Sequence, residues 1–167
     1  ATSDTYLSIA TLHREGGYCF PEYDNKSLTP FINAKDIWYP ILKGEVVGNS
    51  IGIGGDNPLN VLITGPNAGG KSTFIKSLSL SIIFGQTLGI SAGSSFTFTP
   101  FSIINTYLNI PDCKGKESLF EAEMRRSLQH IKIMEKLPKD DFSFVIMDEI
   151  FSSTNPNEGI AGAYAIA

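Results

Sequence analysis

A phosphate-binding loop is the feature that most constrains this chain. The pattern Gly-x-x-x-x-Gly-Lys-Ser/Thr is met by consecutive residues, namely Gly65, Pro66, Asn67, Ala68, Gly69, Gly70, Lys71, Ser72 and Thr73. Loops of this pattern wrap backbone N–H groups around nucleotide phosphates, because glycine lets the chain approach without a Cβ clash. The lysine brings a positive charge to the β- and γ-phosphates, and the hydroxyl after it ligates Mg²⁺. The pattern therefore predicts that Lys71 and Ser72 bind a nucleotide and its metal ion.

The residues on either side of the loop predict the elements that hold it. Residues 59–64 are apolar and β-branched, which is typical of a buried strand, and residues 74–84 repeat apolar side chains at helical spacing. A strand, a glycine-rich loop and a helix together place phosphates at a helix N-terminus, where free amides and the helix dipole favour anions. We therefore expect an α/β fold of the P-loop NTPase type.

A second apolar strand is expected at residues 142–147, and it ends in Asp148 and Glu149. In a nucleotide hydrolase, Asp148 would hold Mg²⁺ directly or through water, and Glu149 would orient or deprotonate the attacking water. Because parallel strands end at one edge of a sheet, we expect Asp148 to lie close to Ser72. On its own, this pattern fits equally well a buried strand that happens to end in two solvated carboxylates. Its pairing with the phosphate loop favours the hydrolase site.

Two residues have both a structural and a functional interpretation. Asn67 lies in the middle of the loop, where its amide would reach the γ-phosphate or the attacking water, but asparagine also fills turn positions. The residues alone leave these two interpretations even. Ser118 stands at the start of a predicted helix with Glu121 three residues later, the spacing of a capping box, so capping is the default interpretation for Ser118.

The remaining patterns predict a mixture of short elements. In chain order we expect a helix at 4–14, a strand at 31–33, an antiparallel hairpin of 46–53 with 60–64, two strands within 96–107, and helices at 117–136 and 159–167. On the helix at 117–136, an apolar stripe predicts the buried face; it consists of Phe120, Met124, Leu128 and Ile131, flanked by Leu119 and Met134.

Composition bounds the class of protein. The 167 residues are 42% hydrophobic, enough for one domain with a core, and the net charge of −4 argues against a broad nucleic-acid surface. No secretory signal and no apolar run long enough to cross a membrane is visible, so we expect an intracellular protein without a membrane partner. Cys19 and Cys113 are expected to be free thiols, and His13 and His130 to be helix-surface residues rather than metal ligands.

Four motifs in this order resemble those of the MutS family of DNA mismatch-repair ATPases. The phosphate loop looks like that of the family, with Ala68 where the family usually has Met. Residues 118–124 resemble the family's serine-containing helix start, and residues 147–150 match its strand-end motif. The segment 38–40 weakly resembles the family's entry to the ATPase domain.

The resemblance implies an ABC-type ATPase domain over residues 31–167, truncated at its C-terminal side, after the end of a helical lever region and linker at residues 1–30. It implies that the whole phosphate loop binds ATP, that Ser72 and Asp148 bind Mg²⁺, and that Glu149, Lys71 and Asn67 are catalytic. Two subunits would share each site, because Ser118 would reach in trans to the ATP of a second MutS-like subunit, identical or not. DNA would be bound through domains absent from this chain, and its mismatch or structure recognition would be coupled to nucleotide state.

The chain departs from the family's pattern after Glu149. MutS proteins usually carry a Gly-Arg-Gly-Thr type of loop there, whereas this chain has Phe151, Ser152, Ser153 and Thr154, which is similar to divergent branches that are not ordinary mismatch sensors. In the family an aromatic residue packs on the adenine, and the corresponding position in this chain falls near Val46 or Val47. The chain stops at Ala167 inside a predicted helix, so we expect a fragment of a longer protein that hydrolyses ATP slowly or not at all in isolation.

Two alternatives stay open at this point. One is a non-catalytic module that binds nucleotide or dimerises. The other is a different ABC-type ATPase of DNA maintenance, although the Leu-Ser-Gly-Gly type of signature of such proteins is not present in the chain.

Overall fold

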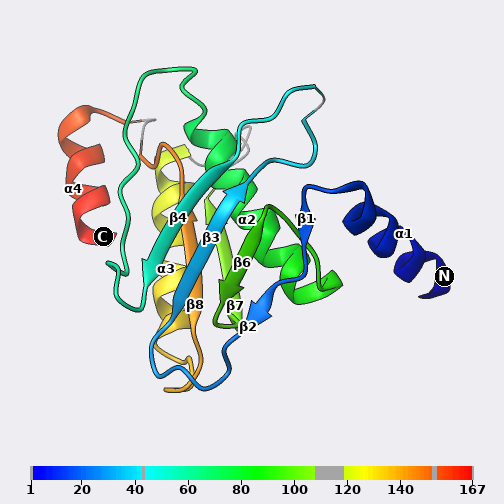
Figure 1. The fold of residues 1–167 in the computed structure, drawn as a ribbon. Coiled ribbons are helices and arrows are strands. Elements are labelled where there is room, and N and C mark those ends of the chain that lie inside the picture. The colour runs from blue at the N-terminus through cyan, green and yellow to red at the C-terminus, as the bar shows by residue number, and fades with distance from the viewer. Residues whose placement is uncertain (1, 43, 108–118, 152–153, 167) are drawn as a thin grey trace. The chain divides into compact units, whose positions relative to one another are not determined.

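The chain forms two compact units, Ala1–Pro100 and Phe101–Ala167, in a mixed α/β arrangement (Figure 1). The computed structural model describes residues 2–42, 44–107, 119–151 and 154–166. The predicted boundary near residue 30 between a lever region and an ATPase domain stays a prediction. In the described parts of the chain, no helix has the length and apolar character needed to cross a membrane.

The first unit contains two helices and two small sheets. Its elements in chain order are α1 (Thr2–Glu15), β1 (Tyr18–Cys19), β2 (Glu22–Tyr23), β3 (Phe31–Ile37), β4 (Asn49–Gly54), α2 (Lys71–Leu88), β5 (Ser91–Ala92) and β6 (Ser95–Phe98). The larger sheet has the order β2-β6-β3-β4, with β2 parallel to β6 and the other pairs antiparallel, and β1 pairs with β5 in an antiparallel pair. The helices expected at 4–14 and 74–84 are confirmed, and the short strand expected at 31–33 is longer.

A bulge in β3 keeps its apolar side chains on the buried face. Ile32 and Ala34 alternate as a half-buried strand requires, and the register then shifts before Ile37, which is fully buried. Asp36 takes the extra position with a φ of 49°. Its N–H donates to Ser50 Oγ at 2.9 Å, which satisfies a backbone group that the ladder leaves unpaired.

Helix α2, which follows the phosphate loop, is fixed to the first unit by its buried face. Ile75, Leu78 and Ile82 are buried along it, at a spacing of one helical stripe. Near its C-terminus, the Tyr23 hydroxyl donates to the Gly85 carbonyl at 2.6 Å, and a Cβ at Gly85 would lie 3.3 Å from the Phe98 ring. The phosphate loop is therefore attached to a helix with a fixed position in this unit.

Two predictions for this region are wrong, namely the strand at 59–64 and the antiparallel hairpin of 46–53 with 60–64. This segment has no regular secondary structure, and Val61 and Leu62 are 44% and 89% exposed. β4 pairs with β3 instead, and the chain leaves β4 through a turn in which Gly54 N–H donates to the Pro58 carbonyl at 3.0 Å. Pro58 has no N–H to continue an antiparallel ladder with β4, so the apolar run after it has no strand partner among the described residues of this unit.

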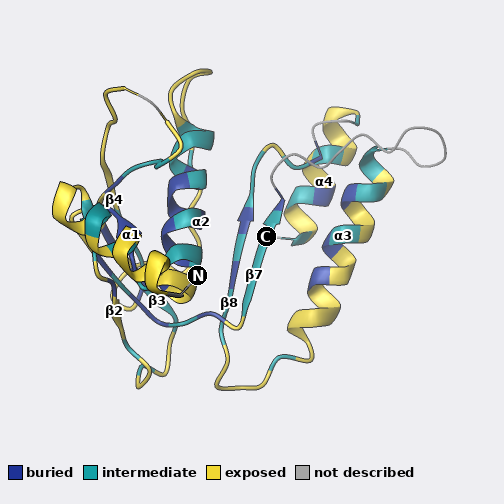
Figure 2. Cartoon of the chain, turned by 90° about the vertical axis from the view of Figure 1, so that its right-hand side faces the viewer, coloured by how far each residue is buried: buried dark blue, intermediate teal, exposed yellow. Residues whose placement is uncertain are grey.

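The described residues of the second unit form a β-α-β arrangement followed by one more helix. Its elements are β7 (Ile103–Tyr107), α3 (Leu119–Met134), β8 (Ser143–Met147) and α4 (Pro156–Ile166). β7 and β8 are parallel, with Tyr107 opposite Met147 at their carboxyl ends. Figure 2 shows α3 and α4 on the same side of this strand pair. The strand expected at 142–147, the strands within 96–107 and the last helix are thus confirmed, with α4 beginning three residues earlier than expected.

The predicted buried face of α3 is wrong. Of the expected stripe, Met124, Leu128 and Ile131 are 40%, 52% and 40% exposed. The buried side chains are polar instead, namely Glu123, Ser127 and His130. His130 was expected on the helix surface, and that expectation is also wrong, since only 6% of it is exposed.

Hydrogen bonds to β7 explain why α3 buries its polar face. The Asn105 amide donates to Nδ1 of His130 at 2.9 Å, and Arg126 Nη2 donates to the Thr106 carbonyl at 2.7 Å. The Tyr107 hydroxyl in turn donates to the Arg126 carbonyl at 2.9 Å. Each of these polar groups has a partner, so burying them avoids the desolvation penalty that an unpaired group would carry. The apolar stripe on α3 shows only that this face could be buried. The hydrogen bonds to β7 determine which face of the helix is buried.

Candidate functional site

The phosphate loop is an exposed turn whose shape comes from its own backbone. Gly69 N–H donates to the Pro66 carbonyl at 3.1 Å, and Ala68 and Gly70 have left-handed φ values of 61° and 83°. A Cβ at Gly69 would lie 2.9 Å from the Pro66 oxygen, closer than real Cβ atoms come to other atoms. Glycine is therefore required at position 69 by contact and favoured at position 70 by conformation.

The loop leads directly into the N-terminus of α2. Gly70 is the N-cap and makes no side-chain cap hydrogen bond, and Phe74 N–H donates to the Gly70 carbonyl at 2.8 Å. The first turn of any helix carries N–H groups that have no acceptor within the helix, and here it contains no acidic side chain. Backbone amides and the positive end of the helix dipole thus favour an anion at this end.

The Lys71 ammonium binds back to the start of the loop. Its Nζ donates to the carbonyl oxygens of Gly65 and Pro66, each at 2.8 Å. Two neutral carbonyls are weaker acceptors for an ammonium than charged phosphate oxygens. The lysine is therefore held beside the loop, where a phosphate group would compete with these carbonyls. Asn67 and Ala68 are exposed at the turn, and Ser72 and Thr73 are half-buried in the first turn of α2.

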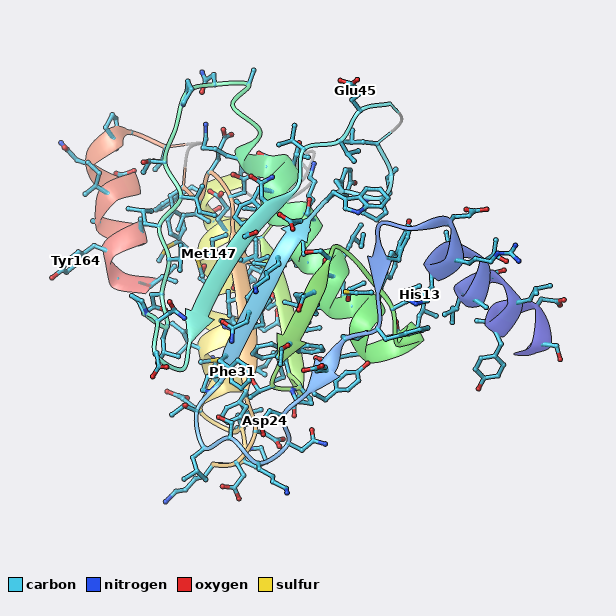
Figure 3. All side chains as sticks on the ribbon, viewed as in Figure 1. His13, Asp24, Phe31, Glu45, Met147 and Tyr164 are labelled. Carbon is cyan, nitrogen blue, oxygen red and sulfur yellow. The ribbon has the colours of Figure 1, made fainter. Side chains whose placement is uncertain are left out.

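The acidic motif lies at the carboxyl end of β8, as the sequence predicts. Met147 is the last residue of that strand, labelled in Figure 3, and Asp148 and Glu149 follow it in a turn. Asp148 is half-buried and Glu149 is exposed. Glu149 has a φ of 51°, a left-handed conformation that glutamate seldom adopts.

The structure brings together the members of each half of the predicted site. Gly65, Pro66 and Lys71 meet in the first unit, and Asp148 and Glu149 are adjacent in the second. The proximity of the two halves, the γ-phosphate contact of Asn67 and the binding of ATP and Mg²⁺ stay predictions. Ser118 and Cys113 lie outside the described residues; α3 begins at the residue after Ser118.

Sequence reasoning gave no role to Glu123 and Phe151, which the structure joins beside the acidic motif. The Phe151 N–H donates to Oε1 of Glu123 at 3.1 Å, and both residues are buried. The Phe151 ring also meets the Phe120 ring edge to face, with centroids 5.6 Å apart. No signal in the sequence links the two residues, because they lie 28 positions apart.

Burial also changes two proton affinities in the second unit. It lowers the pKa of His130 below its usual 6.5, because the charged imidazolium is poorly solvated there. Burial likewise raises the pKa of Tyr107 above its usual 10.0. Both effects keep these residues neutral in the polar network between α3 and β7.

The chain matches the family model of MutS domain V over residues 61–167. It is also similar to the DNA mismatch repair protein msh3 of Aspergillus oryzae, at 29% identity over 168 residues, and to the DNA mismatch repair protein Msh3 of Homo sapiens, at 31% identity over 170 residues. Each similarity covers 99% of this chain but only 15% and 14% of those relatives, so the chain spans a small part of their length.

Proposed function

Because the chain belongs to the MutS family, we propose that it binds and hydrolyses ATP as part of a DNA mismatch-repair or DNA-structure-recognition protein. The observation that carries the proposal is the phosphate loop. Its turn leads into a helix N-terminus whose cap offers no side-chain acceptor, and Lys71 is held by the carbonyls of Gly65 and Pro66. This combination of amides, helix dipole and ammonium suits a chain of phosphates.

The residues present suit a magnesium nucleotide. Ser72 and Asp148 would hold Mg²⁺, since hydroxyl and carboxylate oxygens are the donors it prefers, and its charge would offset that of the β- and γ-phosphates. Glu149 would accept a proton from the attacking water, while Asn67 would contact the γ-phosphate region. The proposal requires the two units to bring Asp148 close to Ser72.

The wider role rests on the relatives. Proteins named as mismatch-repair Msh3 share nearly the whole of this chain at about 30% identity. We propose that this chain pairs with a second MutS-like subunit, whose ATP would be reached by Ser118 in trans. DNA contact would belong to other domains, in keeping with the net charge of −4 here.

The Lys71→Ala substitution tests the phosphate loop. It removes the only ammonium that the described structure places on the carbonyls of the loop, so Mg-ATP binding is expected to fall by about 100-fold or more. Isothermal titration or a fluorescent ATP analogue measures this. Lys76→Ala, five residues further along α2, is the matched control and keeps normal binding. Unchanged binding in Lys71→Ala would show that the loop is not the nucleotide site.

The Glu149→Gln substitution tests hydrolysis separately from binding. Glutamine keeps the shape but is a poor proton acceptor, so turnover is expected to fall by about 10²- to 10⁴-fold while ATP affinity stays the same. Single-turnover hydrolysis with the complete dimeric protein measures the effect. Turnover should also rise more than linearly with protein concentration if each site needs two subunits. Undiminished turnover would remove Glu149 from the mechanism.

A further inference from the structure

The backbone at Phe151 is strained and buried, two residues after the acidic motif. Phe151 has a φ of 55° and only 3% of it is exposed. A bulky aromatic residue rarely adopts a left-handed conformation, and it persists there only when surrounding contacts determine it. Such outliers gather at functional sites, so the contacts that hold Phe151 are informative.

Helix α3 holds Phe151 through its backbone and its ring. The buried Glu123 carboxylate accepts the Phe151 N–H at 3.1 Å, and a hydrogen bond to a charged acceptor is stronger than one between neutral groups. The Phe120 ring, one helical turn before Glu123, meets the Phe151 ring at 5.6 Å. Residues of α3 thus contact both the backbone N–H and the ring of Phe151.

Helix α4 also packs closely against Phe151. A Cβ at Gly162 would lie 3.1–3.3 Å from three carbons of the Phe151 ring, and a Cβ at Gly159 would lie 2.8 Å from the Phe151 carbonyl oxygen. These glycines are three residues apart and so share one face of the helix. Glycine weakens a helix interior, so two of them facing one residue indicate a requirement for close approach.

We propose that Phe151 is a positioning residue for Glu149, held by a clamp that consists of Phe120, Glu123, Gly159 and Gly162. Glu149 precedes Phe151 by two residues and shares its left-handed conformation, with a φ of 51°. Fixing the backbone at Phe151 therefore fixes the direction in which the exposed Glu149 carboxylate leaves the turn. The inference rests on the proposed ATPase function and adds that the clamp supports hydrolysis rather than nucleotide binding.

Two substitutions at Glu123 separate the hydrogen bond from the charge. In the complete dimeric protein, Glu123→Leu removes the acceptor, whereas Glu123→Gln keeps an oxygen that accepts the Phe151 N–H. Small displacements of a reacting group carry large kinetic penalties, so we expect single-turnover ATP hydrolysis to slow by about 10-fold or more in Glu123→Leu. ATP affinity should stay within about twofold, and Glu123→Gln should restore most of the rate.

Gly162→Ala tests the clamp by placing a single methyl group against the Phe151 ring. Alanine is the better helix former, but its Cβ would lie 3.1–3.3 Å from the Phe151 ring, so thermal melting is measured beside hydrolysis. A purely structural role predicts that any loss of rate follows a loss of thermal stability. The clamp instead predicts that the new methyl group displaces the Phe151 ring and slows hydrolysis by about 3- to 10-fold with ATP affinity unchanged. Tyr164→Ala is the control on the same helix, because Tyr164 is 88% exposed and points away from α4 (Figure 3).

The outcomes distinguish this inference from the proposed function. Normal hydrolysis in both Glu123→Leu and Gly162→Ala, with Lys71→Ala inactive, overturns the clamp and leaves the ATPase standing. Equal loss of rate and of ATP affinity in the clamp variants also overturns it. A protein without ATP turnover, or with Lys71→Ala fully active, overturns both proposals.

Discussion

The phosphate loop and the acidic turn both use left-handed backbone, but nearby contacts shape the loop and distant contacts support the turn. In the loop, Gly70 adopts a φ of 83° at no steric cost, and the bonds that shape the turn join residues a few positions apart. In the acidic turn, Glu149 and Phe151 adopt φ values of 51° and 55° against their preference. Phe151 is held by Glu123, which is 28 residues away in sequence.

The difference shows which contacts determine the backbone conformation of each half of the candidate site. The loop is exposed and its conformation is local, so substitutions there should change ligand binding and leave the stability of the fold nearly unchanged. The acidic turn is supported by buried contacts, so substitutions at its supports should change stability, catalysis or both.

Phe151→Ala is expected to have the largest effect on stability. It removes a ring that is 97% buried, and truncation of a buried phenylalanine to alanine usually costs about 3–5 kcal/mol of unfolding free energy. Urea denaturation followed by circular dichroism measures the loss. Phe20→Ala is the matched control, because Phe20 is 55% exposed and should cost far less. Similar losses in the two variants would show that the turn has no buried support.

Gly69→Ala is expected to weaken nucleotide binding without weakening the fold. The new Cβ would lie 2.9 Å from the Pro66 oxygen, so the turn must open and its amides move away from the phosphates. We expect ATP affinity to fall by about 10- to 100-fold, which corresponds to about 1.4–2.7 kcal/mol. The unfolding free energy should change by less than about 0.5 kcal/mol, as for other exposed sites.

Gly65→Ala is the control for that experiment. A Cβ at Gly65 would meet Lys71 carbons only at 3.8–3.9 Å, which is ordinary contact. Calorimetric titration with Mg-ATP should therefore give a smaller loss of affinity than in Gly69→Ala. If the two variants lose affinity equally, the close contact between Gly69 and Pro66 does not shape the nucleotide site.

Acidification should destabilise the second unit through His130. Burial lowers the folded-state pKa of His130 below 6.5, and the unfolded chain therefore binds the proton more readily. The stabilising contribution is complete above about pH 6.5 and is lost as the pH falls towards the folded-state value. Protonation would also place an N–H at Nδ1 against the Asn105 amide, which already donates to that nitrogen at 2.9 Å.

Thermal melting between pH 5 and pH 8 measures this effect. Wild type should lose stability below about pH 6.5, and His130→Gln should flatten that part of the profile. His13→Gln is the control, since His13 lies on α1 with an exposed contact to the Tyr18 carbonyl. A profile that His130→Gln leaves unchanged would show that another group senses the pH.

The sequence alone predicted those elements whose conformation is determined by residues close together in the chain. The phosphate loop, α2 and β8 follow from glycine spacing, helical periodicity and an apolar run, and they form where expected. The segment at 59–64 did not form the expected strand, because strand formation needs a partner edge and the pattern of one segment does not name its partner.

Distance in sequence also explains what was missed at the candidate site. The buried face of α3 depends on His130 meeting Asn105 and on Glu123 meeting Phe151, and no periodicity within the helix encodes those partners. The position of Asp148 and Glu149 at the end of β8 was predictable, since the strand and the acids are adjacent. The left-handed backbone at Phe151 was not, because the contacts that hold this residue come from α3 and α4.

Ala68→Gly should produce the smallest change, and its sign is the sharpest test of the contrast. Ala68 has a φ of 61° in the exposed loop, a conformation that costs a non-glycine residue about 1–2 kcal/mol. Glycine removes that strain but adds about 0.4–1 kcal/mol of unfolded-state entropy, so a net stabilisation of about 0.5 kcal/mol is expected. Ala161→Gly, at an exposed position of α4, is the matched control and should instead destabilise by about 1 kcal/mol. Opposite signs in chemical denaturation would confirm that strain at Ala68 is local and unsupported, because a residue held by a clamp would lose stability when its side chain is removed, as Phe151 is expected to do.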